Sequence, residues 1–582
     1  MRVRDRAALG NRTPHPPQHV NTQPTINKMD QPSPEEYYNL GDYRRNVSTA
    51  NEDAQLWFSR GLIWGYAFNH EESTRCFEKV VELDPTCAMG YWGIALSLGP
   101  NYNKPWQFFD GEDLSATTTR AHRAILEAKE HAPTATPLEN ALIDALQHRY
   151  PQEQPVEDCT EWDKDYAEAM TSVYNEYPDD LDVTALYCDA LMNLTPWGLW
   201  DVKTGEATPG AKTFEAKKAF DRVLERDESF DHPGILHLYI HLMEMSPTPE
   251  IALPIAEYLR GLVPDAGHLE HMPSHIAVLC GEYKRAVADN TSAIRADEKF
   301  LANQPLGHFY NLYRAHDYHF RMYAAMLGGR SKVALESGAE LARIITEPLL
   351  RIESPPMADW LEGFGAMQMH GFLRFGRWEE IIAAEPPEDA ELYCVTTAMM
   401  HYAKGIAYAA TSRILEAEEE RERFLRAMNL VPASRTIFNN RCVDILRVGE
   451  AMLDGEIAYR RGEYDTAFSY LRDAVQRDDS LPYDEPWGWM QPTRHALGAL
   501  LLEQDRVEEA AAVYSADLGV DTSLPRALRH PGNVWASHGY HECLVKMGRK
   551  YEARAMLPQL KSNLAWADVP IKSSCFCRQR TE

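Results

Sequence analysis

The 582-residue sequence lacks the features that define several common classes of protein. No run approaches the roughly 18 apolar residues that a membrane-spanning helix needs, so we expect no membrane span. Lys and Arg number 59 against 87 Asp and Glu, which gives a net charge of −28. A chain of this charge repels phosphate backbones and anionic lipids, so neither nucleic acid nor a membrane is an expected partner.

Paired cysteines and phosphate-binding glycine loops are also missing. The ten cysteines are scattered, and the close pair Cys575 and Cys577 has no matching second pair that would complete a zinc site. This favours a reducing, cytoplasmic setting. The sequence contains no dinucleotide fingerprint and no nucleophile elbow, so we expect no nucleotide cofactor. The zinc-protease motif HExxH is absent as well.

The first 35 residues differ in composition from the rest of the chain. They combine arginines with prolines and polar residues and show no helical periodicity. We predict that residues 1–35 are disordered and that residues 36–582 form a single array. A transit peptide is the alternative, although Pro14 and Pro16 oppose the amphipathic helix that such a signal uses. Met29 is a candidate for the true start.

A repeat with a period near 34 residues runs through the chain. Its first unit places Trp57, Gly61, Phe77 and Pro85 at repeat positions 4, 8, 24 and 32. Small residues at such positions let the two helices of a hairpin approach closely, and proline ends the second helix. The predicted fold is therefore all-α, a tetratricopeptide-like right-handed α-solenoid of stacked helical hairpins.

Histidines gather in the repeats between residues 232 and 375. Nine of the 21 histidines lie within residues 232 to 319, at spacings of three, four and seven that place side chains on one stripe of a helix. In this register they occupy positions 2, 5 and 9, which face the concave groove in proteins that the repeat resembles. The predicted metal ligands are His237, His241, His271, His275, His316 and His319.

Ligand sets made of imidazoles suit copper, zinc or iron. Six histidines allow two three-histidine sites, as in dinuclear copper oxidases, or one site with acid and base residues. We assign Glu244 and Asp317 as candidate catalytic residues, Glu244 as ligand or proton shuttle and Asp317 as a group that orients imidazoles. The alternatives are a polar groove that binds an acidic or peptide ligand, and hydrogen-bonded packing between hairpins.

Further side chains are predicted to support the site or to contact a substrate. Two of them, Trp197 and Trp200, lie in an overlong loop at residues 195–217, and overlong loops are often functional. For the second loop, around residues 483–494, a structural role is the stronger interpretation, in which tryptophans cap a core and the arginine pairs with an acid. The full supporting set is His232, His268, His370, Trp197, Trp200, Glu485, Trp487 and Arg494.

Two motifs carry a resemblance to a known family. HPGxxHxxIHxxE spans His232–Glu244, and HMPSH spans His271–His275. With these motifs the sequence resembles a family of tetratricopeptide-like proteins of bacteria and filamentous fungi. The resemblance covers most of the chain and implies a repeat fold and a metal site, and it names no substrate. One departure, YRAHD at Tyr313–Asp317 in place of a proline and asparagine pattern, leaves the role of Asp317 open.

The predicted function is a metal-dependent enzyme that acts on a small organic molecule, with a slight preference for an oxidoreductase over a hydrolase. The alternative is a non-catalytic scaffold that binds a protein or peptide in its groove, as repeat arrays commonly do. A protein partner or a homodimer through the solenoid is compatible with either function. An adaptor normally places Lys, Arg or Asn at groove positions, whereas this register places His and Glu there.

Overall fold

A computed structural model describes residues 37–578 of the chain. Residues Asn39–Glu582 form one compact unit, and Met1–Tyr38 form a second unit of which only Tyr37 and Tyr38 are described. The segment predicted to be disordered, 1–35, and the alternative start at Met29 lie outside the described residues. Within residues 37–578, no helix is both long enough and apolar enough to cross a bilayer.

The described chain is a succession of α-helices that pack in consecutive pairs. The N-terminal pairs are α1 (Glu52–Tyr66) with α2 (His70–Leu83), α3 (Ala88–Leu98) with α4 (Gly111–His131), α5 (Pro137–Gln147) with α6 (Thr160–Glu176), α7 (Leu181–Met192) with α8 (Thr213–Val223), and α9 (Pro233–Glu244) with α10 (Leu253–Leu259). The central helices are α11 (Gly267–His271), α12 (Pro273–Leu279), α13 (Tyr283–Leu301), α14 (Asn311–Leu327), α15 (Ser331–Ile344), α16 (Glu347–Leu350), α17 (Met357–Gly365), α18 (Met367–Arg374) and α19 (Trp378–Ala383). The C-terminal pairs are α20 (Cys394–Ala410) with α21 (Ile414–Met428), α22 (Cys442–Arg460) with α23 (Tyr464–Asp479), α24 (Thr493–Glu503) with α25 (Val507–Asp517), and α26 (Val534–Lys546) with α27 (Lys550–Trp566). Short 3₁₀ helices span Trp106–Phe108, Ala132–Thr134, Asp227–Asp231, Pro249–Ala252, Arg526–Leu528 and Phe576–Arg578.

The first hairpin shows why the sequence folds in this way. Asn51 begins α1 by accepting hydrogen bonds from the backbone N–H groups of the first turn. Gly61 faces the partner helix, where an added Cβ would lie 2.9 Å from the Phe77 ring, so only glycine permits this approach. Helix α2 ends at Leu83, just before Pro85. The predicted repeat unit is confirmed at the close approach of Gly61 to Phe77 and at the end of its second helix before Pro85.

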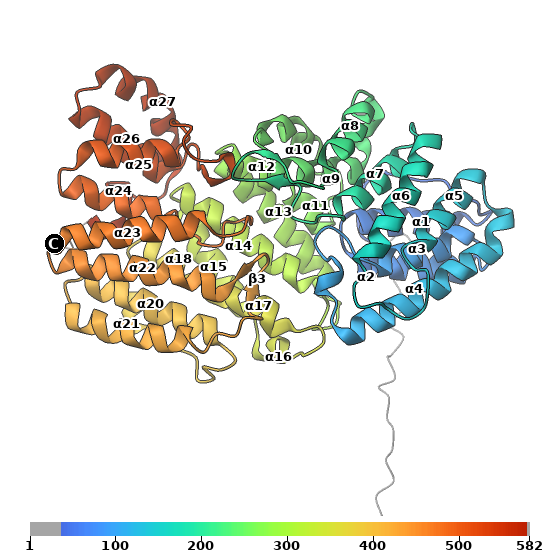
Figure 1. The fold of residues 1–582 in the computed structure, drawn as a ribbon, viewed down its shortest axis with the longest axis horizontal. Coiled ribbons are helices and arrows are strands. Elements are labelled where there is room, and N and C mark those ends of the chain that lie inside the picture. The colour runs from blue at the N-terminus through green and yellow to red at the C-terminus, as the bar shows by residue number, and fades with distance from the viewer. Residues whose placement is uncertain (1–36, 579–582) are drawn as a thin grey trace, which may run out of the picture. The chain divides into compact units, whose positions relative to one another are not determined.

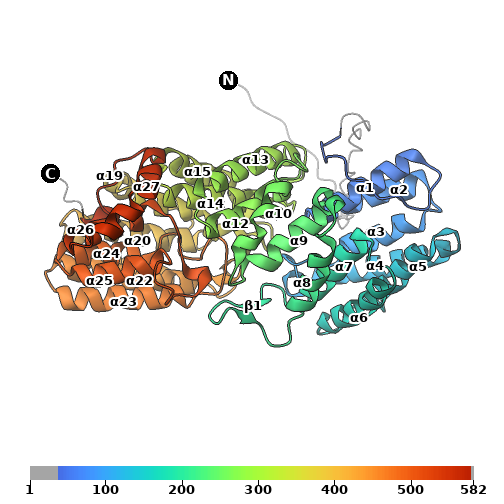
Figure 2. The same cartoon turned by 90° about the horizontal axis from the view of Figure 1, so that it is seen from above.

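Neighbouring hairpins stack through their first helices (Figures 1 and 2). Helix α7 packs on α9, α9 on α12, α11 on α14, α14 on α18, α18 on α20, and α20 on α22. Each first helix therefore buries one face against its own partner and another against the next hairpin, which is the construction of a repeat solenoid. The predicted all-α fold of stacked helical hairpins is confirmed.

Two small antiparallel sheets interrupt the helices. Strands β1 (Trp200–Asp201) and β2 (Glu206–Ala207) pair within the overlong loop between α7 and α8. Strands β3 (Thr436–Ile437) and β4 (Asn440–Arg441) form a hairpin between α21 and α22, with Ile437 opposite Asn440. Both insertions lie beside the central helices that carry the histidines.

Segments far away in the sequence also contact the central helices. Helix α1 packs on α9 from the N-terminal side. From the C-terminal side, the Trp535 indole N–H donates to the Met326 carbonyl at 2.7 Å, and Tyr283 donates to the Pro531 carbonyl at 3.0 Å. Both ends of the array thus contact the helices α9 to α14, and the histidines on these helices are buried.

Candidate metal centre

Four short helical segments carry the central histidines. His237 and His241 lie one turn apart on α9, and Pro273 separates α11 from α12, which carry His271 and His275. Their exposure ranges from 0 to 2%, and His316 on α14 is 7% exposed. These residues, predicted to face the concave groove, are buried, because insertions and the first hairpin cover this face.

The first three-histidine set consists of His237, His241 and His268. One ring nitrogen of each lies within 4.8 Å of those of the other two. His237 donates from Nδ1 to the Tyr66 carbonyl at 2.6 Å, and its Nε2 lies 3.1 Å from Nε2 of His268. His241 donates from Nδ1 to Glu244 at 3.0 Å, and its Nε2 has no hydrogen-bond partner although it is fully buried.

The second three-histidine set consists of His271, His275 and His316. Nε2 of His271 and Nε2 of His275 lie 2.7 Å apart. His271 directs Nδ1 to the Asn290 amide oxygen at 2.7 Å, and the Asn290 amide is itself oriented by the Ala286 carbonyl. His316 adds a buried Nδ1 that has no partner.

Glu244 connects the two sets. Its Oε1 accepts from His241 Nδ1 at 3.0 Å, and its Oε2 accepts from His275 Nδ1 at 2.7 Å. Glu485, from the loop before α24, lies 2.7 Å from the same Nδ1 of His275. Both Glu244 oxygens therefore face Nδ1 atoms, which leaves the Nε2 atoms free to point into the sets.

The electrostatics keep most of these rings neutral. Burial, followed by the mutual repulsion of neighbouring imidazolium charges, holds the pKa of five of them well below the usual value: His237, His241, His268, His271 and His316. His275 is the exception. Burial lowers its pKa, but the carboxylates of Glu485 and Glu244 together outweigh burial and raise the pKa to about 10.

Neutral rings arranged in this way fit a transition metal ion. A metal binds the deprotonated nitrogen of a neutral imidazole, and a carbonyl or carboxylate on the opposite N–H fixes the tautomer that presents it. In the second set, two Nε2 atoms at 2.7 Å repel each other unless a proton or a cation lies between them. Each buried nitrogen left without a partner costs about 1–3 kcal/mol. The donor set, all imidazole, suits copper, zinc or iron.

A third possible cation position involves Glu244, His275 and Glu485. Its histidine atom is the same Nδ1 that already donates to both carboxylates. These three side chains therefore form a hydrogen-bonded support behind the second set. The role of Glu244 as ligand or proton shuttle stays a prediction.

Two predicted residues on the central helices lie outside both sets. His319 packs against Phe364 at 5.2 Å between ring centroids, and burial lowers its pKa to about 3. His370 packs against Trp489 at 4.7 Å. His319, predicted as a ligand beside His316, packs against Phe364 of α17, and its ring nitrogens are not among those that converge in either set. His268, predicted only as a supporting residue, takes its place.

The predicted catalytic residue Asp317 lies behind the second set. Its Oδ1 is 3.1 Å from Nδ1 of His271, and the side chain is fully buried. Burial, and then the nearby carboxyl of Asp297, raise the pKa of Asp317 well above its usual value. Its position suits the orientation of an imidazole, the role predicted for it.

The two loops divide into residues that reach the histidines and residues that do not. Trp197 lies 5.9 Å from His241 between ring centroids, and Glu485 contacts His275. Trp200 instead donates to the Leu242 carbonyl at 2.6 Å, and Trp487 donates to the Asp478 carbonyl at 3.0 Å. Arg494 forms two hydrogen bonds of 2.6 Å to Asp479. The structural interpretation of the tryptophan and arginine in the second loop is supported.

His232 begins α9 and lies away from the sets. Its Nδ1 accepts from the Ile235 N–H at 3.2 Å, and its Nε2 lies 3.3 Å from Asp182. Asp182 also accepts from Tyr66 at 2.7 Å, from Arg45 at 2.6 Å and from Tyr43. The first residue of the histidine motif therefore anchors α9 to α7 and to the N-terminal segment.

Asp182→Asn is expected to destabilise this anchor. Burial raises the pKa of Asp182, but hydrogen bonding to His232 and the charge of Arg45 outweigh burial and hold the pKa well below its usual value. Removing one partner of a buried ion pair lowers the free energy of unfolding by about 3 kcal/mol. We therefore expect the rate of amide hydrogen exchange in α7 and α9 to rise about 100-fold. Because the folded pKa is depressed, this contribution is present above the unfolded pKa of about 3.9 and is lost as the pH falls below it. If the exchange rates of wild type and Asp182→Asn differed by the same factor at pH 7 and at pH 3, this assignment would be contradicted.

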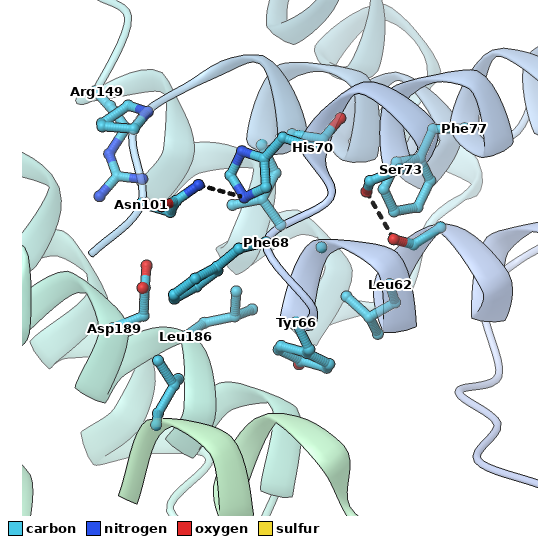
Figure 3. A pocket seen from close by; sticks show the side chains of 16 residues that line it. Leu62, Tyr66, Phe68, His70, Ser73, Phe77, Asn101, Arg149, Leu186 and Asp189 are labelled. Atoms are coloured by element: carbon cyan, nitrogen blue, oxygen red, sulfur yellow. Dashed lines mark hydrogen bonds between the residues drawn. The ribbon is translucent and has the colours of Figure 1, made fainter. Parts of the chain in front are cut away.

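Several supporting residues carry no sequence signal. The Tyr66 carbonyl, Asn290 and the ring of Phe68 contact the sets from α1, α13 and the α1–α2 turn. Phe68, His70 and Asn101 line a cavity of about 40 Å³, and Figure 3 shows how these side chains lie. Its size suits one or two water molecules. Phe68 thus separates this cavity from the first set.

Fold and site together define an all-α repeat protein of the tetratricopeptide kind with a buried six-histidine centre. No family model matches the sequence, and no curated protein matches it. Solved structures with some similarity include the APC/C hetero-tetramer Cut9–Hcn1, with 12% identity over 92% of this chain and 97% of that chain and a TM-score of 0.29. The human IFIT1 dimer with m7Gppp-AAAA has 11% identity over 83% and 90% of the two chains and a TM-score of 0.31. The P58(IPK) TPR domain has 13% identity over 78% and 99% and a TM-score of 0.21. Likenesses this distant carry no argument about function.

Proposed function

We propose that this chain is a metal-dependent enzyme that acts on a small organic molecule, and that oxidation is favoured over hydrolysis. The observation that carries the proposal is the pair of adjacent three-histidine sets, in which ring nitrogens converge within 4.8 Å. A lone pair of histidines on a helix is ordinary packing. Six buried imidazoles from α9, α11, α12 and α14, four of them with Nδ1 hydrogen-bonded, are harder to explain by packing alone.

The protein's own groups would prepare the centre for metal. Tyr66 and Asn290 each accept from an Nδ1–H, and Glu244 accepts from one histidine of each set. These contacts select the tautomer that presents Nε2 to an ion, and such supporting groups raise the affinity of metal sites. Burial excludes water from the centre, which strengthens electrostatic interactions within it.

The choice of oxidation rests on the donor set. Neither set includes a carboxylate, and imidazole-only ligation suits copper and iron as well as zinc. A copper or iron ion would supply electron transfer, whereas zinc would supply a Lewis acid for hydrolysis. Dinuclear copper oxidases have two three-histidine sites, and the two adjacent sets of this chain are similar to that arrangement. This similarity favours redox chemistry.

The second candidate is a non-catalytic scaffold that binds a protein or peptide partner in its groove, and the repeat fold by itself favours this alternative. In that case the histidines would be a structural feature. A cytoplasmic setting is proposed for both candidates, on the grounds that most of the cysteines are free. Cys575 and Cys577 are the exception, since the structure joins them in a disulfide that the sequence analysis did not predict.

Metabolite depletion under two atmospheres tests the proposed function. Metal-loaded wild type and His275→Ala are incubated with a mixture of small metabolites, and mass spectrometry follows each compound. An oxidase depletes a compound in air but not under nitrogen, and a hydrolase depletes it in both. His275→Ala should deplete nothing. If the metal-loaded wild type depletes nothing in either atmosphere but retains a protein partner in a pull-down, the scaffold is the correct function.

A further inference from the structure

Three bulky aromatic residues hold a left-handed backbone conformation beside the histidine sets. Phe68, Trp197 and Phe438 have φ values of 55°, 57° and 44°. Side chains rarely adopt this region, and for a bulky residue it is a true outlier. Such strain persists where the surrounding structure imposes it, and it gathers at functional sites. Each of the three rings packs against a histidine of one of the sets.

Phe68 occupies a position that the other hairpin turns give to small residues. Several hairpin turns of residues 37–578 contain a residue with a positive φ. Among these, the α1–α2 turn alone has phenylalanine at that position. The equivalent residues are Gly281, Gly329, Gly376, Ser412, Gly462, Asp505 and Gly548. The Phe68 ring lies 4.5 Å from His237 and stacks on His241 and His268 at 5.7 and 5.4 Å between centroids. Phe68 is 5% exposed, so it is a fixed wall of the first set.

Trp197 also replaces a residue that its turn would favour. Gly198 N–H donates to the Thr195 carbonyl at 3.0 Å, which closes a turn with Pro196 and Trp197 at its centre. A positive φ at the second central residue is the feature of a type II turn, which takes glycine or asparagine there. Trp197 is partly exposed, and its ring contacts Tyr102 at 5.3 Å and His241 at 5.9 Å. It therefore stands between solvent and the first set.

Phe438 repeats this arrangement at the second set. The β3–β4 hairpin has a two-residue loop, Phe438 and Asn439, and a positive φ at the first of these. A type II′ turn has this feature and takes glycine there. Phe438 is partly exposed, and its ring lies 4.8 Å from His316 and 5.4 Å from Phe364. The hairpin thus places an aromatic ring between solvent and the second set.

We propose that Trp197 and Phe438 are access gates, one over each three-histidine set, and that Phe68 is the fixed wall behind the first set. Each gate lies on an irregular segment, where local opening needs less disruption than it would in a packed helix. Two separate gates on two different insertions let each set exchange small molecules with solvent independently. This inference rests on the proposed function, in which molecules from solvent reach the sets.

The gates are tested by the rate at which diethyl pyrocarbonate modifies individual histidines in the chelator-treated full chain, mapped by peptide mass spectrometry. The variants are Trp197→Gly and Phe438→Gly, because glycine adopts the positive φ without strain and preserves each turn. Phe438→Gly should accelerate modification of His316 about tenfold and leave His241 unchanged, and Trp197→Gly should do the reverse. Ser412→Gly, in a hairpin turn with φ 64°, is the matched control and should change neither.

Conservative variants and an internal reference separate gating from loosening. Trp197→Tyr and Phe438→Tyr keep a ring over the set and should retain the wild-type rates. His370, buried outside both sets, should stay unmodified in every variant. Equal rates in wild type and both glycine variants, or acceleration of both sets in each variant, would overturn the proposal. Diethyl pyrocarbonate modifies the metal-free protein, so the gates can be tested even if the chain binds no metal. A failure to bind metal would refute the proposed function and leave this test unaffected.

Discussion

Glu244→Gln is expected to weaken metal binding at both three-histidine sets, by about 10- to 100-fold each. The carboxylate accepts from His241 of one set and from His275 of the other. A glutamine side chain has one accepting oxygen, and its NH₂ group would face the second Nδ1–H. The ring that faces the NH₂ group must then change tautomer and protonate the nitrogen that a metal needs, and the ring that faces the amide oxygen loses the negative charge that supports its Nε2 as a ligand, so both sets are weakened. Competition titration against a chromophoric chelator measures the two affinities.

Glu485→Gln is the matched control for this prediction. Glu485 contacts His275 at 2.7 Å and no histidine of the first set. Its replacement should therefore weaken the second set and leave the first unchanged. If Glu244→Gln affected one set alone, or neither, Glu244 would not connect them.

Alanine substitutions are expected to remove the ions one set at a time. His237→Ala should lose the ion of the first set and keep that of the second, because the two sets share no ligand. His271→Ala should do the opposite, and the double variant should bind none. Metal content after reconstitution and desalting, measured by elemental analysis, reports each result.

His319→Ala is the control for the alanine series. It removes an equally buried imidazole from α14, the helix that also carries His316, but one that belongs to neither set. It should keep both ions. A variant series in which His319→Ala loses as much metal as His271→Ala would mean that histidine loss acts through general destabilisation.

Much of the fold follows from local sequence signals. Gly61 against Phe77 and the end of α2 before Pro85 both act within one hairpin, so a repeat pattern is sufficient to predict them. The stacking of hairpins then follows, because each buries an apolar face that it cannot bury alone. The insertions that carry β1–β2 and β3–β4 have no repeat pattern, and their packing over the central helices was not predictable in this way.

The site was predictable only in part, for a related reason. Helical spacing identifies His237 with His241 and His271 with His275, because each pair lies on one stripe of its own segment. Spacing does not tell which neighbour each stripe meets, so His319 was grouped with His316 while His268 was left outside. The burial of the histidines could not be predicted either, because it depends on residues distant in the sequence. Phe68 comes from the first hairpin, and Glu485 lies more than 200 residues beyond His275.

Elemental analysis of the wild-type protein, purified without a polyhistidine tag, tests the central claim most directly. After incubation with copper, zinc or iron and removal of excess, the six-histidine centre should retain one transition metal ion for each three-histidine set. Retention of less than about 0.2 equivalent of every metal would contradict it, because the buried imidazoles that converge in each set bind such ions tightly once His275 has released its proton.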